Sequence, residues 1–342
     1  MNVLVTGGAG FIGTNLCRLL SEDERFGRVI ALDNLSTGYR QNLEDCTADL
    51  VVGDILDADL VRTLVNEVDA VVHLAARGSV PRSIEDPVAT HQVNVNGTLS
   101  VLEACRARGD VHLVFASSSS VYGANPILPK AEHLATMPIS PYGASKLAAE
   151  SYVLAYQHAY QLPTLAFRFF NVYGPYQAAE HDYAAVIPKF IAAAHRGEAV
   201  TIHGDGRQTR DFTFVGSVVD TICMALRDRL AHPSPVNLAF GVQTELQAVL
   251  DLIEQLSDCA PIERQHVATR LADIRASQAD PTLLKALFPD AAPRALEAGL
   301  AATIDWFSSG GLRPDETGYT APLVDLRPEV ESSALFMPVR NR

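Results

Sequence analysis

The sequence predicts an α/β fold: a doubly wound parallel sheet with a smaller C-terminal α/β lobe. In the first half, short Val/Leu-rich runs alternate with helical patterns. A glycine-rich turn joins the first run to a helix, and the alternation weakens beyond about residue 174. Buried strands separated by helices form crossover units, so we expect a parallel sheet covered on both faces.

Six runs of the first half are predicted strands, and they span residues 2–6, 28–32, 50–52, 70–74, 111–116 and 164–169. Later come a predicted helix at 186–196, a turn at 204–206, a helix after residue 216, a strand at 236–239 and further helices. We expect residues 1–174 to form mainly the sheet domain, 175–309 mainly the lobe, and 310–342 a tail without periodicity. Open α/β sheets bind ligands at the carboxyl ends of their strands, so a ligand should lie between the two parts.

The chain has 342 residues, 48% of them apolar, and a formal net charge of -13. This length is sufficient for one large or two medium domains. The acidic balance and the lack of a Lys/Arg cluster argue against a nucleic-acid partner, because nucleic-acid surfaces are basic. An anionic ligand has to be bound by a few placed arginines.

Five dispersed cysteines, an odd number without C-x-x-C spacing, predict reduced and mostly buried thiols and no metal site. The apolar runs fall short of the roughly 18 residues that a membrane span requires. The chain enters a predicted strand at once, without a basic leader. We therefore expect a cytoplasmic protein with no membrane partner.

Residues 6–13, TGGAGFIG, follow the first predicted strand and open a helix. Gly7, Gly10 and Gly13 give one glycine spacing of a dinucleotide-binding turn, and Gly8 completes G-x-G-x-x-G. Glycines let the backbone approach a pyrophosphate, and the helix from Phe11 supplies free amides and the positive end of its dipole. In this strand, turn and helix context, the pattern predicts a dinucleotide site of the Rossmann type.

Polar and small residues follow the next predicted strands. Asp33 ends the second strand, where a carboxylate accepts hydrogen bonds from the adenosine ribose. A carboxylate repels a 2'-phosphate and no arginine follows at once, so we favour NAD over NADP. Asp54 is placed for the adenine amino group, and Ala75 and Ala76 are small enough for the dinucleotide to pass. His73 is interpreted as a core histidine.

Tyr142 and Lys146 lie near the start of a predicted helix, in the run YGASK. A spacing of four residues places the phenol and the ammonium on one helix face, where the lysine lowers the cost of ionising the tyrosine. Such pairs are more often an exposed aromatic beside a snorkelling lysine. The glycine turn and a run of four serines, 117–120, favour a catalytic base instead.

These features make the chain similar to the extended short-chain dehydrogenase/reductase superfamily, and specifically to its nucleotide-sugar epimerase branch. The resemblance runs from residue 1 to about residue 307. Its marks are TGGAGFIG (6–13), DNLSTG (33–38), GDILD (53–57), HLAA (73–76), NVNGT (94–98), SSSSVYG (117–123), SPYGASK (140–146), RFFNVYGP (168–175) and HGDGRQTRDF (203–212).

The resemblance implies that Tyr142 is the catalytic base, that Lys146 binds the nicotinamide ribose and that Ser118 hydrogen-bonds the reacting hydroxyl. It implies NAD as the cofactor, bound by the glycine turn, the strand ends and the catalytic helix. The predicted cofactor residues are Gly7, Gly10, Phe11, Ile12, Gly13, Asp33, Asn34, Ser36, Thr37, Gly38, Asp54, Ile55, Leu74, Ala75, Ala76, Asn94, Tyr142 and Lys146.

The resemblance also implies a nucleotide-sugar site. Asn171 is similar to the residue that meets the nucleotide diphosphate, and Arg210 and Arg270 are similar to two arginines that neutralise it. For Arg270 the alternative is a solvated surface arginine. The predicted substrate residues are Ser79, Arg82, Ser118, Ser119, Ser120, Asn171, Val186, Arg210, Arg270 and Ser277.

In the implied reaction, Tyr142 takes the proton of the sugar 4'-hydroxyl while hydride passes to the nicotinamide, which leaves a 4-keto sugar. The pKa of a free tyrosine is about 10, so positive charge from Lys146 and oxidised nicotinamide is needed. If the keto sugar turns over while its diphosphate stays bound, return of the hydride inverts C4. NAD then remains bound as a catalytic cofactor.

The sequence also bears on the choice among relatives. Dehydratases and decarboxylases place an acid just after the catalytic Ser or Thr, where this chain has Ser119 and Ser120, so elimination is disfavoured. The runs 78–83 and 183–188, and Ser277 where some relatives have a bulky Tyr, favour room for an N-acetyl group. We predict 4-epimerisation of a UDP-hexose or UDP-N-acetylhexosamine. The alternatives are a keto-sugar reductase, a UDP-glucuronate 4-epimerase, or a dinucleotide-sensing protein without chemistry.

Helices predicted at about 86–108 and 140–160 carry Ala/Leu-rich faces. In relatives, the corresponding helices pair into a four-helix dimer seam, so the resemblance implies a homodimer. The alternative is that these faces are buried in the monomer core.

Overall fold

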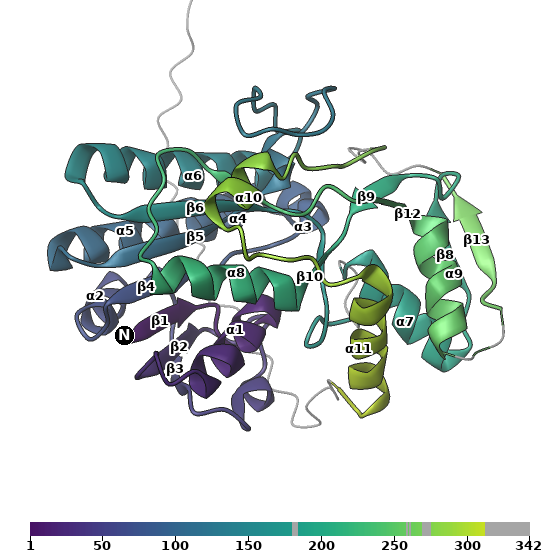
Figure 1. Ribbon diagram of the computed structural model, residues 1–342, viewed down its shortest axis with the longest axis horizontal. Helices are drawn as coiled ribbons and strands as arrows, with labels where there is room; N and C mark the ends of the chain where they lie inside the picture. Colours follow the sequence, from purple (N-terminus) through teal and green to yellow (C-terminus); the bar gives the residue numbers. More distant parts are fainter. Residues whose placement is uncertain (180–183, 258, 260, 269–274, 312–342) are drawn as a thin grey trace, which may run out of the picture.

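The computed structural model describes residues 1–179, 184–257, 259, 261–268 and 275–311. A parallel sheet with helices on both faces occupies one side of the molecule, and a smaller lobe of helices and short strands occupies the other (Figure 1). The fold class predicted from the sequence is confirmed.

The main sheet has seven parallel strands in the order β11-β6-β5-β4-β1-β2-β3. The strands are β1 (Val3–Thr6), β2 (Val29–Asp33), β3 (Asp49–Val52), β4 (Ala70–His73), β5 (His112–Ser118), β6 (Thr164–Phe169) and β11 (Val236–Leu238). The direction of strand succession reverses between β1 and β4, which is the topological switch point where such sheets bind ligands.

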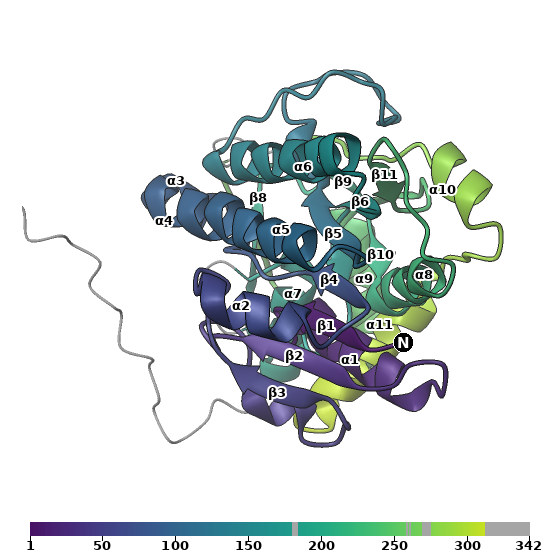
Figure 2. The same ribbon diagram turned by 90° about the vertical axis from the view of Figure 1, so that its left-hand side faces the viewer.

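The sheet is buried between two helix layers, as Figure 2 shows. Alternate residues of β1 face opposite layers, since Val3 and Val5 belong to one apolar core and Leu4 to the other. The helices of the first layer are α1 (Phe11–Glu22) and α8 (Val215–Arg227). The helices of the second layer are α2 (Ala58–Val65), α5 (Gly97–Arg108) and α6 (Pro141–Tyr160).

The helix predicted at 86–108 consists of three successive parts. They are α4 (Pro87–His91), a π-helical turn η2 (Gln92–Asn96) and α5. The side chain of Asp86 caps α4 by accepting the N–H of Ala89 (3.0 Å), which separates it from α3 (Val80–Glu85). The π turn widens the helix at Asn94, in the predicted cofactor site.

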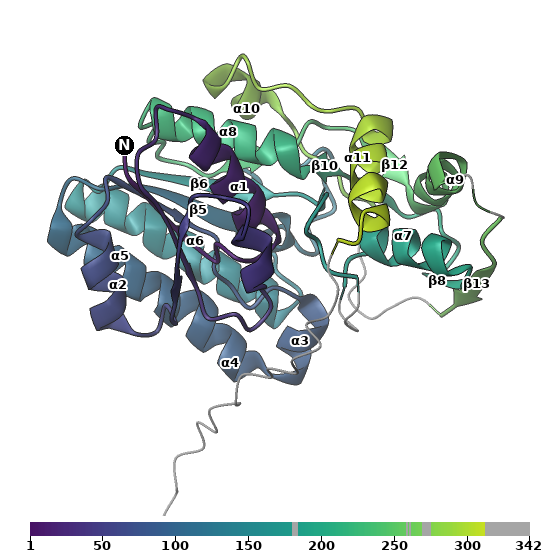
Figure 3. The same cartoon turned by 90° about the horizontal axis from the view of Figure 1, so that it is seen from below.

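The lobe is built from short strand pairs and three packed helices, α7, α9 and α11 (Figure 3). Its strands are β7 (Val172–Tyr173), β8 (Val200–His203), β9 (Thr209–Asp211), β10 (Thr213–Phe214), β12 (Gln243–Glu245) and β13 (Arg264–Val267). Its helices are α7 (Val186–Arg196), α9 (Leu246–Ser257) and α11 (Leu296–Ser308). Because β7 comes directly after β6 and pairs with β10, the lobe lies beyond the carboxyl ends of the main strands.

The remaining helices are short: η1 (Arg40–Leu43), η3 (Ser119–Val121) and α10 (Thr282–Leu287). α10 packs beside β11, and β11 and α8 belong to the main sheet and its helix layer although they come from the second half of the chain. The chain therefore passes between the two parts more than once, and the boundary near residue 174 stays a prediction.

The five cysteines are free thiols, and Cys17, Cys105 and Cys223 are buried. Within the described ranges, no helix has the length and apolar character needed to cross a membrane. The same ranges contain no group of three or more His, Cys, Asp or Glu side chains arranged to hold a metal ion. Residues 312–342 of the predicted tail lie outside the described residues.

Candidate active site

The glycine turn between β1 and α1 is packed too tightly for side chains. Gly7 has φ +72°, and a Cβ there would lie 2.8 Å from the N of Ala75. A Cβ on Gly13 would lie 2.0 Å from the Gly7 carbonyl oxygen. Gly10 is the N-cap of α1 and offers no side-chain cap, so the first amides and the positive helix end face the turn. These features fit a dinucleotide pyrophosphate.

Asp33 lies at the end of β2, buried beside this turn. Its Oδ2 accepts the N–H of Ala9 (3.0 Å) and its Oδ1 the N–H of Leu35 (2.8 Å). Burial raises the pKa of Asp33, and these backbone donors oppose the rise. The N–H of Tyr39 donates to the Ala9 carbonyl (3.1 Å), so the predicted cofactor run Asn34, Ser36, Thr37 and Gly38 folds back onto the glycine turn.

At the neighbouring strand ends the structure brings further predicted cofactor residues together. Asn34 donates from Nδ2 to Asp54 Oδ2 (2.8 Å), which joins the ends of β2 and β3. The N–H of Leu74 donates to the Thr6 carbonyl (3.1 Å), which places residues 74–76 beside the glycine turn. Ile55, by contrast, is buried in the core, where its side chain occupies the space next to Gly97. The Ile55 side chain is therefore part of the apolar core.

Asn94 lies in the π turn and uses its whole side chain within the protein. Its Oδ1 accepts the N–H of Arg77 (2.7 Å), and its Nδ2 donates to Ser145 Oγ (2.9 Å). Ser145 Oγ in turn donates to the carbonyl of Tyr142 (2.8 Å). Asn94 thus ties the loop after β4 to the helix that carries the predicted base.

Helix α6 presents Tyr142 and Lys146 to the carboxyl end of β5. Ser140 caps the helix by accepting the N–H of Gly143 (3.1 Å), and Pro141 fills its first position. Lys146 Nζ donates to the Ala116 carbonyl (2.9 Å). The Tyr142 phenol interacts with the Ser118 hydroxyl. The three predicted catalytic residues are therefore together.

A buried ion pair holds the same helix against the sheet. Glu150, two turns after Tyr142, accepts from Arg168 of β6 at both oxygens (Nη2 to Oε1 2.6 Å, Nε to Oε2 3.0 Å) and from Ser117 Oγ (2.6 Å). Both charged side chains are about 4% exposed or less. Because the pair is satisfied on both sides, it sets the register of α6 along β5.

Burial shifts the pKa values of both Tyr142 and Lys146. Burial raises the pKa of Tyr142, and the hydrogen bond with Ser118 only partly opposes this. Burial also lowers the pKa of Lys146 to about 8. Desolvation therefore disfavours both charged forms, and the expected help of Lys146 and oxidised nicotinamide in ionising Tyr142 stays a prediction.

The predicted substrate loop after β4 packs beside the catalytic helix. Ser79 caps α3 and accepts the N–H of Arg82 (3.2 Å). Ser83 Oγ accepts the N–H of Tyr142 (3.0 Å), so the loop and the base are joined directly. Ser119 and Ser120 form η3 just after Ser118, whose Oγ accepts the N–H of Ser120 (3.1 Å).

The other predicted substrate residues gather around β9. Asn171, with φ +26°, donates from Nδ2 to the Asp211 carbonyl (3.3 Å). The Thr209 carbonyl accepts from Arg210 Nη1 (2.9 Å) and from the N–H of Ser277 (3.1 Å). Two segments distant in the sequence therefore meet the short strand that carries Arg210. Val186 begins α7. Arg270 and part of the run 183–188 lie outside the described residues.

Asp211 is a buried carboxylate that sequence reasoning missed, although it follows Arg210 in the quoted run. Its Oδ2 accepts the N–H of Gly241 (3.0 Å) and of Ala279 (3.0 Å), and burial raises its pKa to about 6. It joins β9 to the loop after β11 and to the segment of Ser277. The available signal was a carboxyl group between Arg210 and a strand-like apolar run.

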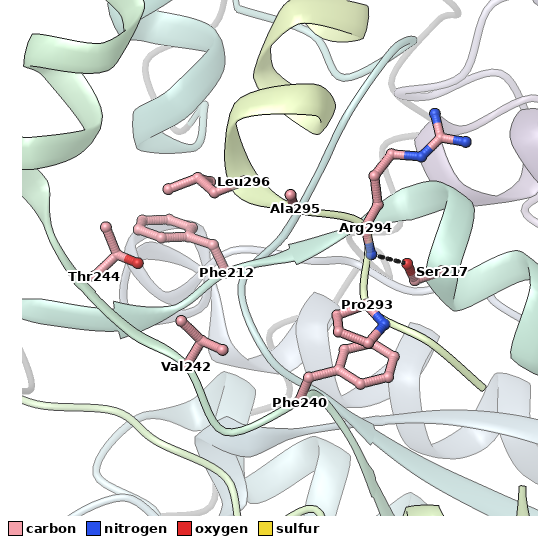
Figure 4. A pocket seen from close by; sticks show the side chains of 9 residues that line it. All are labelled: Phe212, Ser217, Phe240, Val242, Thr244, Pro293, Arg294, Ala295 and Leu296. Atoms are coloured by element: carbon pink, nitrogen blue, oxygen red, sulfur yellow. Dashed lines mark hydrogen bonds between the residues drawn. The ribbon is translucent and has the colours of Figure 1, made fainter. Parts of the chain in front are cut away.

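A cavity of about 290 Å³ is lined in part by the residue that follows Asp211 (Figure 4). Phe212, the next residue of the chain, forms one wall, and the Arg294 side chain points away from the other lining groups. The nine lining residues are Phe212, Ser217, Phe240, Val242, Thr244, Pro293, Arg294, Ala295 and Leu296. None of them is a predicted site residue, so the cavity is distinct from the Tyr142 centre.

Comparison with known proteins identifies the family to which the chain belongs. A model described as the NAD dependent epimerase/dehydratase family matches residues 3–239. A UDP-glucose 4-epimerase of Mycolicibacterium smegmatis is 37% identical over 314 residues, which cover 90% of this chain and 98% of that protein. The UDP-N-acetylglucosamine 4-epimerase from Methanobrevibacter ruminantium M1, solved with UDP-N-acetylmuramic acid, is 34% identical with a TM-score of 0.85 and covers 90% of this chain and 98% of that one. The UDP-glucose 4-epimerase of Thermus thermophilus, solved with NAD, is 34% identical with a TM-score of 0.81 and covers 90% and 99%.

The fold and these relatives define the class, an NAD-dependent enzyme that modifies nucleotide sugars. The chain belongs to the NAD-dependent epimerase/dehydratase family, and NAD is its cofactor. Other relatives at 30% to 37% identity are named as dTDP-glucose 4,6-dehydratases, a probable UDP-glucuronate 4-epimerase and a UDP-N-acetyl-alpha-D-glucosaminuronate decarboxylase. Family membership therefore leaves the choice between epimerisation and elimination to the residues of the site.

Proposed function

We propose that this enzyme is a 4-epimerase of UDP-sugars that acts on a UDP-hexose or a UDP-N-acetylhexosamine. The carboxyl end of β5 carries the proposal: Ser118 meets Tyr142, and the next residues are Ser119 and Ser120. Elimination needs a proton donor near these positions, and a serine hydroxyl is too weak an acid. One base followed by serines at positions 119 and 120, in place of an acid, supports oxidation and re-reduction at a single carbon.

In this proposal Tyr142 removes the proton of the 4'-hydroxyl and later returns it, while Ser118 hydrogen-bonds the same oxygen. The chemistry that NAD supplies when bound is acceptance and return of a hydride. The residues around β9 keep the diphosphate in place while the 4-keto sugar turns over. Because the raised pKa of Tyr142 opposes its role as a base, ionisation requires positive charge beside the phenol.

Lys146 is the protein's contribution to that charge. An ammonium has three donors, and one of them is bound to the Ala116 carbonyl. The lysine is buried, so the field of its charge is weakly screened. Its lowered pKa of about 8 leaves it mostly protonated at neutral pH.

The sugar preference rests on the lobe. Ser277 is half-buried and is held to β9 by its N–H. A serine there leaves room for an acetamide, and relatives named above include a UDP-N-acetylglucosamine 4-epimerase. We therefore propose that UDP-N-acetylhexosamines are accepted as well as UDP-hexoses.

Two alternatives use the same residues. A keto-sugar reductase would also need Tyr142 and Lys146, but it would consume reduced nicotinamide in each cycle. A UDP-glucuronate 4-epimerase would perform the same inversion on a uronate, and one named relative is a probable enzyme of that kind.

The test begins with the purified protein. It should release NAD on denaturation, interconvert UDP-glucose with UDP-galactose or UDP-GlcNAc with UDP-GalNAc, and show no net change in the absorbance of reduced nicotinamide. Stoichiometric absorbance change would instead identify a reductase. Turnover confined to UDP-glucuronate would identify the uronate epimerase, and a 4-keto-6-deoxy product would overturn the argument from Ser119 and Ser120.

We also propose a homodimer formed by the α4 to α6 region. Large apolar side chains are exposed there: Ile84 is 51% exposed on α3, Val88 65% on α4 and Tyr152 42% on α6. These three helices pack against one another. Replacing Val88 by Glu should shift the protein toward monomer in sedimentation or light scattering. The matched change at Val242, 56% exposed in the lobe, should not.

A further inference from the structure

His73 lies at the end of β4, between the ends of β1 and β5, at the switch point of the sheet. It is 1% exposed. Its ring contacts hydroxyl groups on both sides: Nδ1 lies 2.6 Å from Thr6 Oγ1, and Nε2 lies 3.0 Å from Thr98 Oγ1. Neither hydroxyl belongs to the predicted site, and the sequence suggested only a core histidine.

The neighbouring bonds determine where the protons lie. Thr98 Oγ1 donates to the carbonyl of Asn94 (2.6 Å), so at His73 it accepts, and Nε2 carries the hydrogen. Nδ1 is then an acceptor, and Thr6 donates to it. The Thr6 oxygen accepts the N–H of Ala75 (3.2 Å). The hydrogen bonds of this group therefore all run in one direction, from the Ala75 N–H toward Thr98, and the assignment requires a neutral ring. Burial keeps the ring neutral by lowering the pKa of His73 to about 3.

This hydrogen-bonded chain joins the two halves of the catalytic centre. At one end it fixes Ala75. This residue lies so close to Gly7 that a Cβ on Gly7 would be 2.8 Å from the Ala75 N. At the other end it fixes the carbonyl of Asn94 in the π turn. The side chain of Asn94 continues to Ser145, and Ser145 to the carbonyl of Tyr142. A buried path thus runs from the glycine turn to the base.

We propose that His73 is a positioning residue for the dinucleotide and the base. Its neutral ring sets the spacing between the cofactor loop after β4 and the start of α6, so the NAD site and the Tyr142 phenol are kept in one geometry. This role rests on the proposed function only for the identity of the reacting sugar. The binding of NAD tests it separately.

The chain offers a matched control. His112 is also fully buried and neutral, and it lies on the adjacent strand β5, but at the opposite end of the sheet. Its Nε2 contacts the carbonyl of Leu230 (2.9 Å). This contact lies at the end of the sheet opposite to the strand ends that are proposed to bind the cofactor. His73→Leu and His112→Leu remove the same group from the same sheet. Thr98→Val breaks the hydrogen-bonded chain at its other end, because valine has nearly the shape of threonine but no hydroxyl.

The experiment titrates NAD into each nucleotide-free variant and measures thermal unfolding of the same samples. We expect His73→Leu and Thr98→Val to weaken NAD binding by about tenfold or more, the affinity equivalent of one buried polar group left unpaired. His112→Leu should bind like the parent even if its melting temperature falls as far. At saturating NAD, the first two variants should keep a lowered kcat with an unchanged KM for the sugar.

Equal NAD affinity in all three variants would overturn the inference, and so would a loss in His112→Leu as large as in His73→Leu. If His73→Leu does not fold, Thr98→Val decides the matter by the same comparison. A parent protein that binds NAD but epimerises no UDP-sugar would refute the proposed function and leave this result intact.

Discussion

The proposed cofactor half and the proposed sugar half of the site are built in different ways. The cofactor half comes from the ends of neighbouring strands in one sheet, where buried hydrogen bonds fix residues such as Asp33 and Asn94. The proposed sugar half comes from Asn171, Arg210 and Ser277: Arg210 lies on β9, and the other two residues are joined to backbone carbonyls of β9. A rigid half suits chemistry shared by a family, and an assembled half suits a substrate that differs between members.

The largest effect should come from the base, which belongs to neither half alone. Tyr142→Phe removes the phenol oxygen and retains the ring, so we expect kcat to fall by about 10²- to 10⁴-fold. NAD should still be present after denaturing release, because the backbone contacts of α6 are unchanged. Full activity in this variant would mean that another group accepts the proton.

A second prediction probes the rigidity of the cofactor half. Gly7→Ala places a Cβ against Ala75 at a positive φ, so we expect NAD affinity to fall by about tenfold or more from strain and displacement together. Gly109→Ala is the control, since its φ is +94° and nothing lies within 4 Å of the added Cβ. It should lose stability without losing NAD. Comparable NAD loss in both variants would indicate that strain alone accounts for the effect.

A third prediction addresses the sugar half through Asp211. Asp211→Asn should raise KM for the nucleotide sugar by about tenfold, because the carboxylate orders the segment of Ser277, and NAD binding should be unchanged. Glu198→Gln, an exposed change in the same lobe, is the control. A parallel loss of NAD in Asp211→Asn would mean that the two halves are not independent.

The raised pKa of Asp211 gives a further test, the direction in which the free energy of unfolding changes with pH. Because its pKa is raised to about 6 from 3.8, the folded protein holds the proton more tightly than the unfolded chain. Its contribution to the free energy of unfolding is therefore full below about pH 4 and decreases as the pH rises toward 6, by about 1.4 kcal/mol per pH unit. Asp211→Asn should flatten that slope in denaturant titrations at several pH values. An unchanged slope would assign the proton to another group.

The same contrast explains what the sequence could predict. The glycine turn, Asp33 and the Tyr142 and Lys146 pair are local patterns, because strand, turn and helix periods place them within a few residues. The His73 chain, the π turn at Asn94 and the role of Asp211 depend on contacts between distant segments, which no local spacing encodes. The raised pKa of Tyr142 was missed for a related reason: burial is a property of the packed site and not of the pair.

The smallest and most selective effect should come from Ser277→Tyr. A tyrosine at this half-buried position would fill the space proposed for an acetamide, so kcat/KM for UDP-GlcNAc should fall by about 10- to 100-fold, the range for a steric change in a binding pocket. Turnover of UDP-glucose and NAD content should stay near the parent values, because the substitution retains the backbone N–H that holds Ser277 to β9. Ser277→Ala, which leaves the space open, is the control and should retain both substrates. Equal losses on both sugars in Ser277→Tyr would show that this segment shapes the whole sugar half, and the division of labour between the two halves would then lie elsewhere in the lobe.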